Sequence, residues 1–321
     1  MIHHAYLTTN LAMSARACIL LLALLAPSAQ AQSAADALQF VEIAPGVYLR
    51  HGAMEVANAG NRGHIANLGV IVGDERVAVI DAGGSYNEGK ALLDAVARIT
   101  DLPVAWLIVT HMHPDHALGA AAFAERGIPV VGHVNLADAL NRRRDAYVKP
   151  VIEALGRDAD GTRVVLPDVT VMPGRDVELD LGGRVLQLRA QPTAHTNNDL
   201  TVYDTQADLL WLSDLLFVDR IPVVDGSLLG WLAVLEVLSQ RNVSRVVPGH
   251  GPVPTDWKAA IARQQNYLEG LARGVREVIR RGGGIAQAVA SVGLSARDRW
   301  ELFDEYHGRN VTAAFAELEW E

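Results

Sequence analysis

The chain has 321 residues, of which 50% are hydrophobic and 20% charged, so it can bury a large core and is neither disordered nor fibrous. Its formal net charge of -9 argues against a nucleic-acid partner, because binding a phosphate backbone needs a basic face. The dense basic run Arg142-Arg143-Arg144 is followed at once by Asp145, and we interpret it as a solvated face of a helix.

The N-terminus has the pattern of an export signal. Arg16 precedes an apolar run from Ile19 to Ala26, and small residues suited to cleavage end at Ala31. We therefore expect residues 1–31 to be a signal peptide, with Met13 as an alternative start.

After cleavage of the signal peptide, we expect the mature chain to consist of residues 32–321 and to be periplasmic. The apolar run is too short to cross a bilayer, so we expect no membrane span there. Cys18 is the only cysteine and lies in the signal segment, which leaves the mature protein without a thiol or a disulfide.

The first part of the mature chain predicts short strands separated by turns and one long loop. The Gly/Asn-rich stretch from Gly52 to Asn67 lacks aliphatic periodicity and predicts an exposed loop. Alternating or continuous apolar runs predict strands at 38–43, 47–50, 68–72 and 77–80.

Helices and strands alternate in the rest of the chain. Helical spacing at 91–99 feeds an apolar strand at 104–109, and a second helix-strand unit covers 117–131 before helical stretches that reach about residue 156. Further strands are predicted at 163–166, 169–171, 184–188, 200–203 and 209–212. From about residue 255 the chain is mainly helical. This order predicts an α/β four-layer sandwich, two sheets with helices outside, and a C-terminal helical extension.

Three histidines and a carboxylate lie within six residues at the end of a predicted buried strand. Imidazole nitrogens suit zinc-class divalent ions and a carboxylate can join them, whereas no thiolate is available in the mature chain. At a strand end, the first two histidines can converge on one ion while the next turn aims the last two residues at a second. The segment is His111-Met112-His113-Pro114-Asp115-His116.

Three later residues follow strand-like runs in the same way: His195, Asp214 and His250. Each alone is a weak signal, because a lone histidine or aspartate at a strand end is more often a hydrogen-bonded turn residue. Together with the six-residue cluster they complete a set of seven candidate metal ligands.

The order and spacing of these seven residues resemble the metallo-β-lactamase fold superfamily, whose marker is H-x-H-x-D-H followed by His, Asp and His. The segment Val79-Ile80-Asp81-Ala82-Gly83 resembles the first motif of that superfamily. There the aspartate supports the metal loop by hydrogen bonds rather than binding metal, which implies the same role for Asp81. The resemblance covers about residues 38 to 255.

The resemblance implies a role for each ligand. His111, His113 and His195 would hold a first ion. Asp115, His116 and His250 would hold a second, and Asp214 would bridge the two. Two zinc ions are implied, with iron or manganese as possible substitutes, and a bridging hydroxide would be the nucleophile. Asp115 would orient the attack and is the implied catalytic residue.

Several branches of the superfamily remain open. Class B3-like β-lactamases use the same histidine cluster but typically carry cysteine or serine at the position of Asp214, whereas glyoxalase-type thioesterases and related hydrolases have aspartate there. Two-iron redox relatives use glutamate at the position of His113. An iron-dependent persulfide dioxygenase remains an alternative, because ligand types alone do not distinguish iron from zinc.

Five further segments resemble the quinoprotein relay system zinc metallohydrolase family. They are residues 61–67, 195–202, 213–218, 223–227 and 309–315. This resemblance implies an exported protein associated with periplasmic quinoprotein dehydrogenases, and it implies no particular substrate. The leading hypothesis is an exported dinuclear hydrolase of a small molecule containing an ester, thioester, lactam or related bond. The alternative is a non-catalytic metal-binding accessory of the quinoprotein system.

Outside the metal ligands, the sequence offers a few pocket candidates. His64 and Arg62 lie in the early loop, which in this fold can overhang the metals, and Arg220 follows Asp214 closely enough to meet an anionic substrate group. Near the C-terminus, Trp300, Phe303 and Tyr306 are spaced as an apolar helix stripe and are expected in the core.

Overall fold

The first sheet is built by the N-terminal part of residues 38–321, the residues that the computed structural model describes. Its strands lie in sequence order and pair antiparallel up to β4, then parallel from β4 to β7. The parallel half needs crossovers, which contain the helices α2 (Tyr86–Ile99), α4 (Ala120–Glu125) and α5 (Leu136–Leu155). The strands are β1 (Val41–Ala44), β2 (Val47–Arg50), β3 (Leu68–Val72), β4 (Val77–Ile80), β5 (Val104–Ile108), β6 (Val130–His133) and β7 (Val169–Val171).

The second sheet has the order β12-β11-β10-β9-β8. Its strands are β8 (Val177–Asp180), β9 (Val185–Ala190), β10 (Leu200–Asp204), β11 (Leu209–Phe217) and β12 (Arg245–His250). Only β11 and β12 pair in parallel, and α6 (Leu228–Ser239) lies in the crossover between them. Both strands therefore end at the same edge of the sheet.

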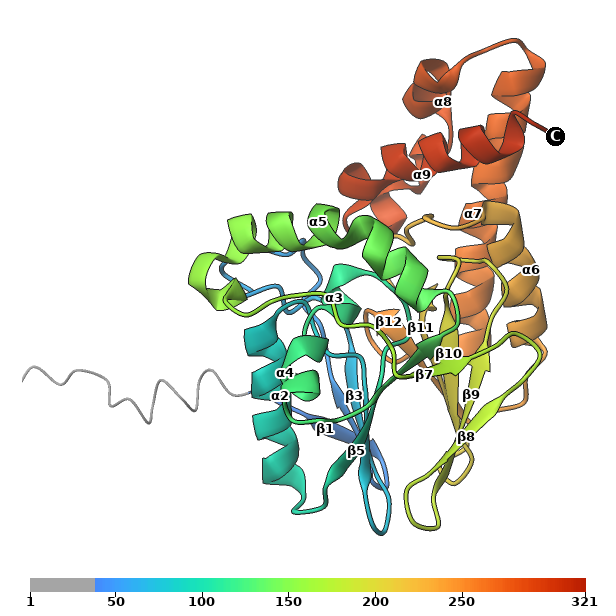
Figure 1. The fold of residues 1–321 in the computed structure, drawn as a ribbon. Coiled ribbons are helices and arrows are strands. Elements are labelled where there is room, and N and C mark those ends of the chain that lie inside the picture. Colours follow the sequence, from blue (N-terminus) through green and yellow to red (C-terminus); the bar gives the residue numbers. More distant parts are fainter. Residues whose placement is uncertain (1–37) are drawn as a thin grey trace, which may run out of the picture. The chain divides into compact units, whose positions relative to one another are not determined.

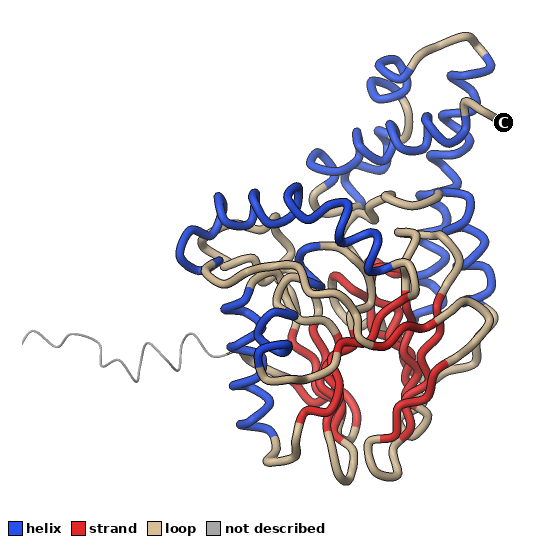
Figure 2. The backbone as a smooth tube through the Cα atoms, viewed as in Figure 1, coloured by secondary structure: helices blue, strands red, loops and turns tan. Residues whose placement is uncertain are grey.

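Three hydrophobic clusters separate four layers, which confirms the predicted αββα sandwich (Figures 1 and 2). Alternation along the strands distributes side chains between the clusters: in β4, Val77 and Val79 pack toward α2, while Ala78 and Ile80 face the other sheet. Trp211 of β11 is fully buried between the sheets. Its ring approaches the opposite sheet so closely that a methyl group at Gly69 would lie 2.5 Å from Trp211 Cη2.

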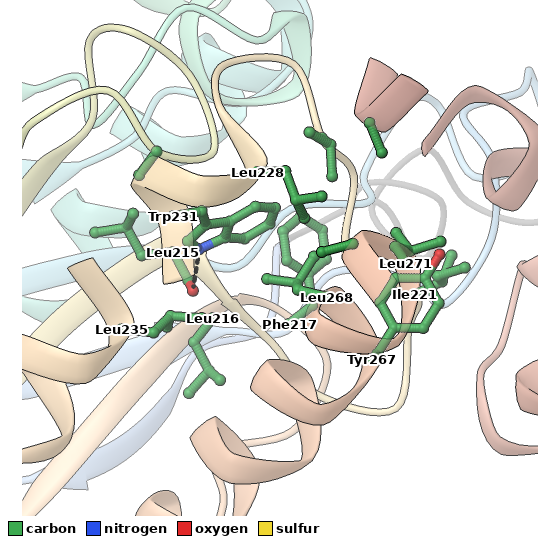
Figure 3. Packing of buried hydrophobic residues seen from close by; sticks show 14 of the residues in the cluster. Leu215, Leu216, Phe217, Ile221, Leu228, Trp231, Leu235, Tyr267, Leu268 and Leu271 are labelled. Atoms are coloured by element: carbon green, nitrogen blue, oxygen red, sulfur yellow. Dashed lines mark hydrogen bonds between the residues drawn. The ribbon is translucent and has the colours of Figure 1, made fainter. Parts of the chain in front are cut away.

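Helices from the C-terminal third cover the second sheet. Figure 3 shows Trp231 of α6 donating a hydrogen bond to the Leu215 carbonyl at 3.0 Å, amid leucines of α6 and of α7 (Trp257–Arg280). Two more helices, α8 (Ile285–Ser291) and α9 (Phe303–Leu318), complete the predicted C-terminal extension, with the short 3₁₀ helix η2 (Leu294–Arg299) between them. Two other short helices, α3 (Pro114–Ala117) and η1 (Gly156–Ala159), lie in the first half.

Some boundaries differ from those expected. Residues 163–166 form no strand: Val164 is buried, but it sits in a loop without ladder partners. Strand β8 had no clear sequence signal, because Leu179 is its only buried residue. The expected signal peptide and Cys18 lie outside the described residues, so that expectation stays a prediction. Residues 38–321 cluster as one unit, and none of their helices is both long and apolar enough to cross a bilayer.

Candidate metal centre

The H-x-H-x-D-H segment follows β5 directly and contains the short helix α3. His111 lies in a bend after β5, His113 has extended backbone just before the helix, and Pro114 occupies its first turn, where proline's missing N–H costs no hydrogen bond. Asp115 and His116 follow on the helix. The change from this bend to helical backbone explains why the two pairs of side chains point to different groups.

The other three candidate ligands come from the second sheet and its loops. His195 lies between β9 and β10, and His250 ends β12. Asp214 lies in β11, where the pairing with β12 shifts register around Ser213, whose φ is +47°. Gly249 is required opposite this irregularity, because a Cβ at that position would collide with Asp214 Oδ1 and with its backbone.

The structure brings all seven predicted ligands together in two groups of ligand atoms, each group spanning no more than 4.8 Å. In the first group, His113 Nδ1 lies 3.1 Å from His111 Nε2 and 2.9 Å from His195 Nε2. Asp214 Oδ2 completes this group, 3.3 Å from His195 Nε2. Three imidazole nitrogens and one carboxylate oxygen thus converge on one point.

The second group consists of Asp115, His116 and His250. Asp115 Oδ2 lies 3.3 Å from His250 Nε2 and 3.7 Å from His116 Nε2. Asp214 stands between the groups, with Oδ1 at 3.2 Å from His116 Nε2 and Oδ2 at 3.4 Å from His250 Nε2. This position fits the bridging role that the sequence resemblance implied.

Two atoms at the boundary of the groups have no hydrogen-bond partner among the described residues. They are His116 Nε2 and Asp214 Oδ1, both fully buried, which lie 3.2 Å apart but do not meet with the geometry of a hydrogen bond. A buried polar atom without a partner costs about 1–3 kcal/mol, so such atoms need an explanation. Divalent cations satisfy imidazole nitrogens and carboxylate oxygens at once, and the donor set fits zinc-class ions.

Burial and charge act against each other at this centre. Burial lowers the pKa of His111 well below its ordinary value, which keeps its ring neutral and able to bind a cation. At His116 burial acts in the same direction, yet the carboxylates of Asp214 and Asp81 outweigh it and raise the pKa. Burial likewise opposes the charge of Asp115, but the neighbouring His116 and His250 lower its pKa.

Asp81 supports the ligands from behind, as the first motif implied. It is fully buried, and its Oδ2 accepts hydrogen bonds from His116 Nδ1 and Thr110 Oγ1, both at 2.8 Å. The backbone N–H of Thr110 donates to Asp81 Oδ1 at 2.8 Å. A carboxylate on Nδ1 fixes the orientation of the ring and leaves Nε2 of His116 for the cation.

Backbone carbonyls orient two other imidazoles. His195 Nδ1 donates to the Val223 carbonyl at 2.7 Å, and His250 Nδ1 lies 2.8 Å from the Ile65 carbonyl. Fully buried Asn67 holds the segment around His250 by donating to the Pro248 and Gly251 carbonyls, both at 2.9 Å. In each case the Nε2 atom faces the metal group.

Sequence reasoning missed two functional residues, Asp225 and Arg143. Asp225 Oδ2 lies 3.0 Å from His113 Nε2, which turns Nδ1 of that ring toward the metal group. Arg143 forms a short hydrogen bond to the same carboxylate oxygen and donates to Tyr147 Oη at 3.1 Å. The basic run was interpreted as a solvated helix face, and the Arg143 side chain is indeed 38% exposed, but its guanidinium also pairs with Asp225 at the pocket. Its neighbours Arg142 and Arg144 are exposed.

Arg220 lies at the pocket, but its guanidinium is already in contact with protein groups. It is buried, with Nη1 2.7 Å from His250 Nδ1 and Nη2 3.3 Å from Tyr306 Oη. Trp300 and Phe303 are in the core as expected, whereas Tyr306 is half-buried and lines the pocket. A role for Arg220 in substrate binding stays a prediction.

His64 is absent from the residues that line the metal pocket. Its Nε2 lies 3.9 Å from Glu88 Oε1, and Arg50 Nη1 lies at the same distance from that oxygen. Glu88 is buried and accepts a hydrogen bond from Gly84 N at 2.7 Å. Its burial, only partly offset by Arg50, raises its pKa to about 8. Substrate binding by His64 also stays a prediction, as does any such role for Arg62.

The metal groups lie in the wall of an open pocket of about 280 Å³. Residues of the second sheet, of the loops that border both sheets and of the helices α3, α5 and α9 surround it, and in Figure 1 α5 crosses above the strand ends. Its charged lining includes Asp115, Asp214, Asp225, Arg143, Arg220 and Arg309. The ligands are therefore accessible to a small molecule from one side.

Comparison with known proteins identifies the class. The family model described as "Metallo-beta-lactamase superfamily" matches residues 61–250, more than half of the chain. The chain therefore belongs to the metallo-β-lactamase superfamily, whose members typically bind divalent metals and are metal-dependent hydrolases.

Individual relatives are distant. A "Beta-lactamase-like protein 2 homolog" from Caenorhabditis elegans is 24% identical over 208 residues, 65% of this chain and 62% of that protein. A "Linear primary-alkylsulfatase" from Pseudomonas sp. is 30% identical over 67 residues, 21% of this chain and 13% of that protein. The chain thus spans less than two thirds of the length of these curated relatives.

Solved structures share the fold. A metallo-beta-lactamase from Pontibacter korlensis aligns with a TM-score of 0.58 and 21% identity, covering 72% of this chain and 99% of the other. One from Pseudomonas aeruginosa, solved in its mono-zinc form, aligns with a TM-score of 0.56 and 15% identity, covering 72% and 95%.

Proposed function

We propose that this protein is a hydrolase that binds two divalent metal ions, zinc by preference, and cleaves an ester, thioester, lactam or related bond. The observation that carries the proposal is the convergence of seven buried or half-buried ligand side chains, with His116 Nε2 and Asp214 Oδ1 left without hydrogen bonds. Zinc is proposed because the donors are imidazoles and carboxylates, and because one structural neighbour was solved in a mono-zinc form.

When bound, such ions lower the pKa of a bound water and polarise the carbonyl or phosphoryl oxygen of a substrate. The residues of this chain would bind the ions, orient the substrate and transfer the proton. Asp115 is our proposed catalytic residue, because its side chain is 17% exposed and faces the pocket, whereas the Asp214 side chain is only 4% exposed. Its carboxylate can orient the attacking group and move a proton to the leaving group.

We further propose that the protein is exported and acts beside a periplasmic quinoprotein dehydrogenase system. The support is the signal-like N-terminus and the five segments that resemble the quinoprotein relay family. Members of those segments, Ile65, Val223, Asp225 and Arg309, line the metal pocket. Because the segments that resemble the quinoprotein relay family contribute residues to the pocket, the resemblance favours a common ligand with that family over a common fold alone.

The hydrolase proposal is tested by a substrate screen with metal-loaded and chelator-treated protein. The panel contains esters, thioesters, lactams, phosphoesters and, because of the alkylsulfatase relative, sulfate esters. We expect at least one class to be hydrolysed, and chelation to abolish that activity.

Substitution of Asp115 provides the matched comparison. Asp115→Asn should reduce kcat by a factor of about 10² or more, while Asp145→Asn on the exposed face of α5 should not change it. Activity that survives chelation would contradict metal-dependent hydrolysis. A folded, metal-loaded protein that hydrolyses no class would favour the non-catalytic accessory instead.

A further inference from the structure

A second cavity of about 280 Å³ opens beside the metal pocket, and we call it the apolar chamber. Its walls come from α5 and from the loop between β2 and β3. Among residues 38–321, Asp115 is the only charged residue that lines it. The apolar lining includes Ala57, Ile65, Pro150, Val151, Ala154 and Leu155.

The chamber wall on α5 includes a stripe of small residues on one helix face. Ala146, Pro150 and Ala154 are spaced four residues apart, so they lie on the same face of the helix. All three are exposed although they are apolar. A core would bury this stripe under large side chains. Here it borders an open space instead, which suits an apolar ligand.

The chamber and the metal pocket share a wall. Ile65, Pro114, Asp115, Tyr147 and Tyr306 line both. Tyr147 stands at the junction, with its ring centroid 6.5 Å from that of His113 and its hydroxyl held by Arg143. A molecule whose reacting bond lies at Asp115 can therefore extend into the chamber without crossing protein.

The metal pocket also contains a guanidinium that has no side-chain partner among the described residues. Arg143 pairs with Asp225, and Arg220 contacts His250 and Tyr306. Arg309 of α9 lines the same pocket and is exposed, and within residues 38–321 its guanidinium has no hydrogen-bond or ion-pair partner. An unpaired guanidinium at the rim of a small-molecule pocket is suited to a carboxylate, sulfate or phosphate group.

We propose that the ligand of this pocket is an anionic amphiphile, with an apolar arm in the apolar chamber and a negatively charged group paired with Arg309. The inference rests on the proposed function and specifies its substrate class. The reacting bond would lie between the two ends, at Asp115 in the shared wall. Arg309 is then a specificity-determining residue, and α5 selects the length of the apolar arm.

Binding of unreactive carboxylates tests the inference without turnover. Acetate, butanoate, hexanoate, octanoate and the neutral octanamide are titrated into the metal-loaded full chain by calorimetry. Affinity should rise with chain length, by up to roughly fourfold for each methylene that becomes buried. Octanamide should bind at least about tenfold more weakly than octanoate, since it lacks the charge that Arg309 recognises.

Two variants with matched controls assign the two ends. Arg309→Gln should weaken the binding of octanoate about tenfold and leave the binding of octanamide unchanged. Arg309→Lys should bind octanoate more tightly than Arg309→Gln but less tightly than the wild type. The control Arg273→Gln, on the exposed face of α7, should bind both ligands like the wild type. Ala154→Phe, which fills the chamber, should weaken octanoate and octanamide alike, whereas Ala233→Phe on the exposed face of α6 should not. Melting temperatures confirm that each variant is folded.

Equal affinity for acetate and octanoate would contradict the claim that the apolar chamber binds an apolar arm. Octanoate affinity that is unchanged in Arg309→Gln would contradict the claim that Arg309 binds the anionic group. Because no hydrolysis is measured, a protein that fails the substrate screen can still pass this titration. Conversely, if only short neutral esters are hydrolysed, with a KM unaffected by Arg309→Gln, the hydrolase proposal stands and this inference fails.

Discussion

At the scale of single residues, Asp81 shows how a side chain can govern the metal centre without facing it. It holds the Nδ1 side of His116 and the backbone of Thr110, the residue that precedes the first ligand. The same logic applies to Asp225, which turns His113. Ligand geometry at this centre is therefore set by a surrounding layer of carboxylates and carbonyls.

Asp81→Asn should weaken metal binding about 10- to 100-fold, because an amide cannot accept from Thr110 and His116 as a carboxylate does. Affinity is measured by competition with a chromogenic chelator. The matched variant Asp101→Asn, at an exposed turn, should bind metal like the wild type. An unchanged affinity in Asp81→Asn would show that the hydrogen bonds behind His116 do not matter to the ion.

Glu88 makes stability depend on pH. Its pKa is raised by burial from 4.5 to about 8, so between those values the folded state keeps a proton that the unfolded state has lost. The contribution of Glu88 to stability therefore falls as pH rises through this window.

Glu88→Gln should remove this dependence, since glutamine stays neutral and can still accept from Gly84 N. The free energy of unfolding of the variant minus that of the wild type is measured at pH 5 and at pH 8. This difference should be more than about 1 kcal/mol larger at pH 8, since one pKa unit corresponds to about 1.4 kcal/mol. Urea unfolding at both pH values measures the difference, with exposed Glu236→Gln as control. A constant difference would mean that Arg50 keeps Glu88 ionised.

At the scale of elements, α9 is attached to the loop that carries Asp225. Asn310 is fully buried on this helix. Its Oδ1 accepts from Val224 N at 2.9 Å, and its Nδ2 donates to Pro222 O and, at 3.0 Å, to Tyr267 Oη. The C-terminal extension thus positions part of the pocket and is more than a cover.

Asn310→Ala should cost about 1–3 kcal/mol for each buried group left unpaired, and it should loosen the loop that carries Asp225. We expect a lower urea midpoint together with weaker metal retention. Asn266→Ala, on an exposed position of α7, serves as control. If stability falls while metal retention stays normal, α9 contributes only to packing.

Elements differed in how far the sequence could predict them. The bounds of β3 and β4 follow from continuous apolar runs, because these strands are buried on both faces. The edge strand β8 buries one side chain and so has almost no pattern. The local sequence was also sufficient to predict the H-x-H-x-D-H segment as a metal site. The role of Arg143 could not be predicted in this way, because it depends on how α5 packs against the loop of Asp225, a contact between residues 82 positions apart.

At the scale of the whole molecule, the two sheets are joined by a single inner core that contains Trp211. Four of the candidate metal ligands lie in the segment that follows β5 of the first sheet, and the other three lie in the second sheet or its loops, so this core also fixes the distance between the two halves of the centre. Trp211 fits against Gly69 of the facing sheet. The four-layer arrangement was predictable from element order, but this pairing of a large ring with a glycine needed the structure.

Trp211→Ala should destabilise the fold by about 3–5 kcal/mol, as expected for deleting a large buried side chain. Guanidinium unfolding followed by circular dichroism measures the loss. Val237→Ala, at a side chain that is 66% exposed, should stay within about 0.5 kcal/mol of wild type. A loss below about 1 kcal/mol in Trp211→Ala would show that the inner core relaxes around the gap.

The metal content of the purified, folded chain tests the central claim most directly. After loading with zinc and exhaustive dialysis, elemental mass spectrometry should find about two ions per wild-type chain. His195→Ala, which breaks the first group, and His116→Ala, which breaks the second, should each retain about one ion. A wild-type chain that retains one ion or fewer would contradict a two-metal centre built from these seven residues.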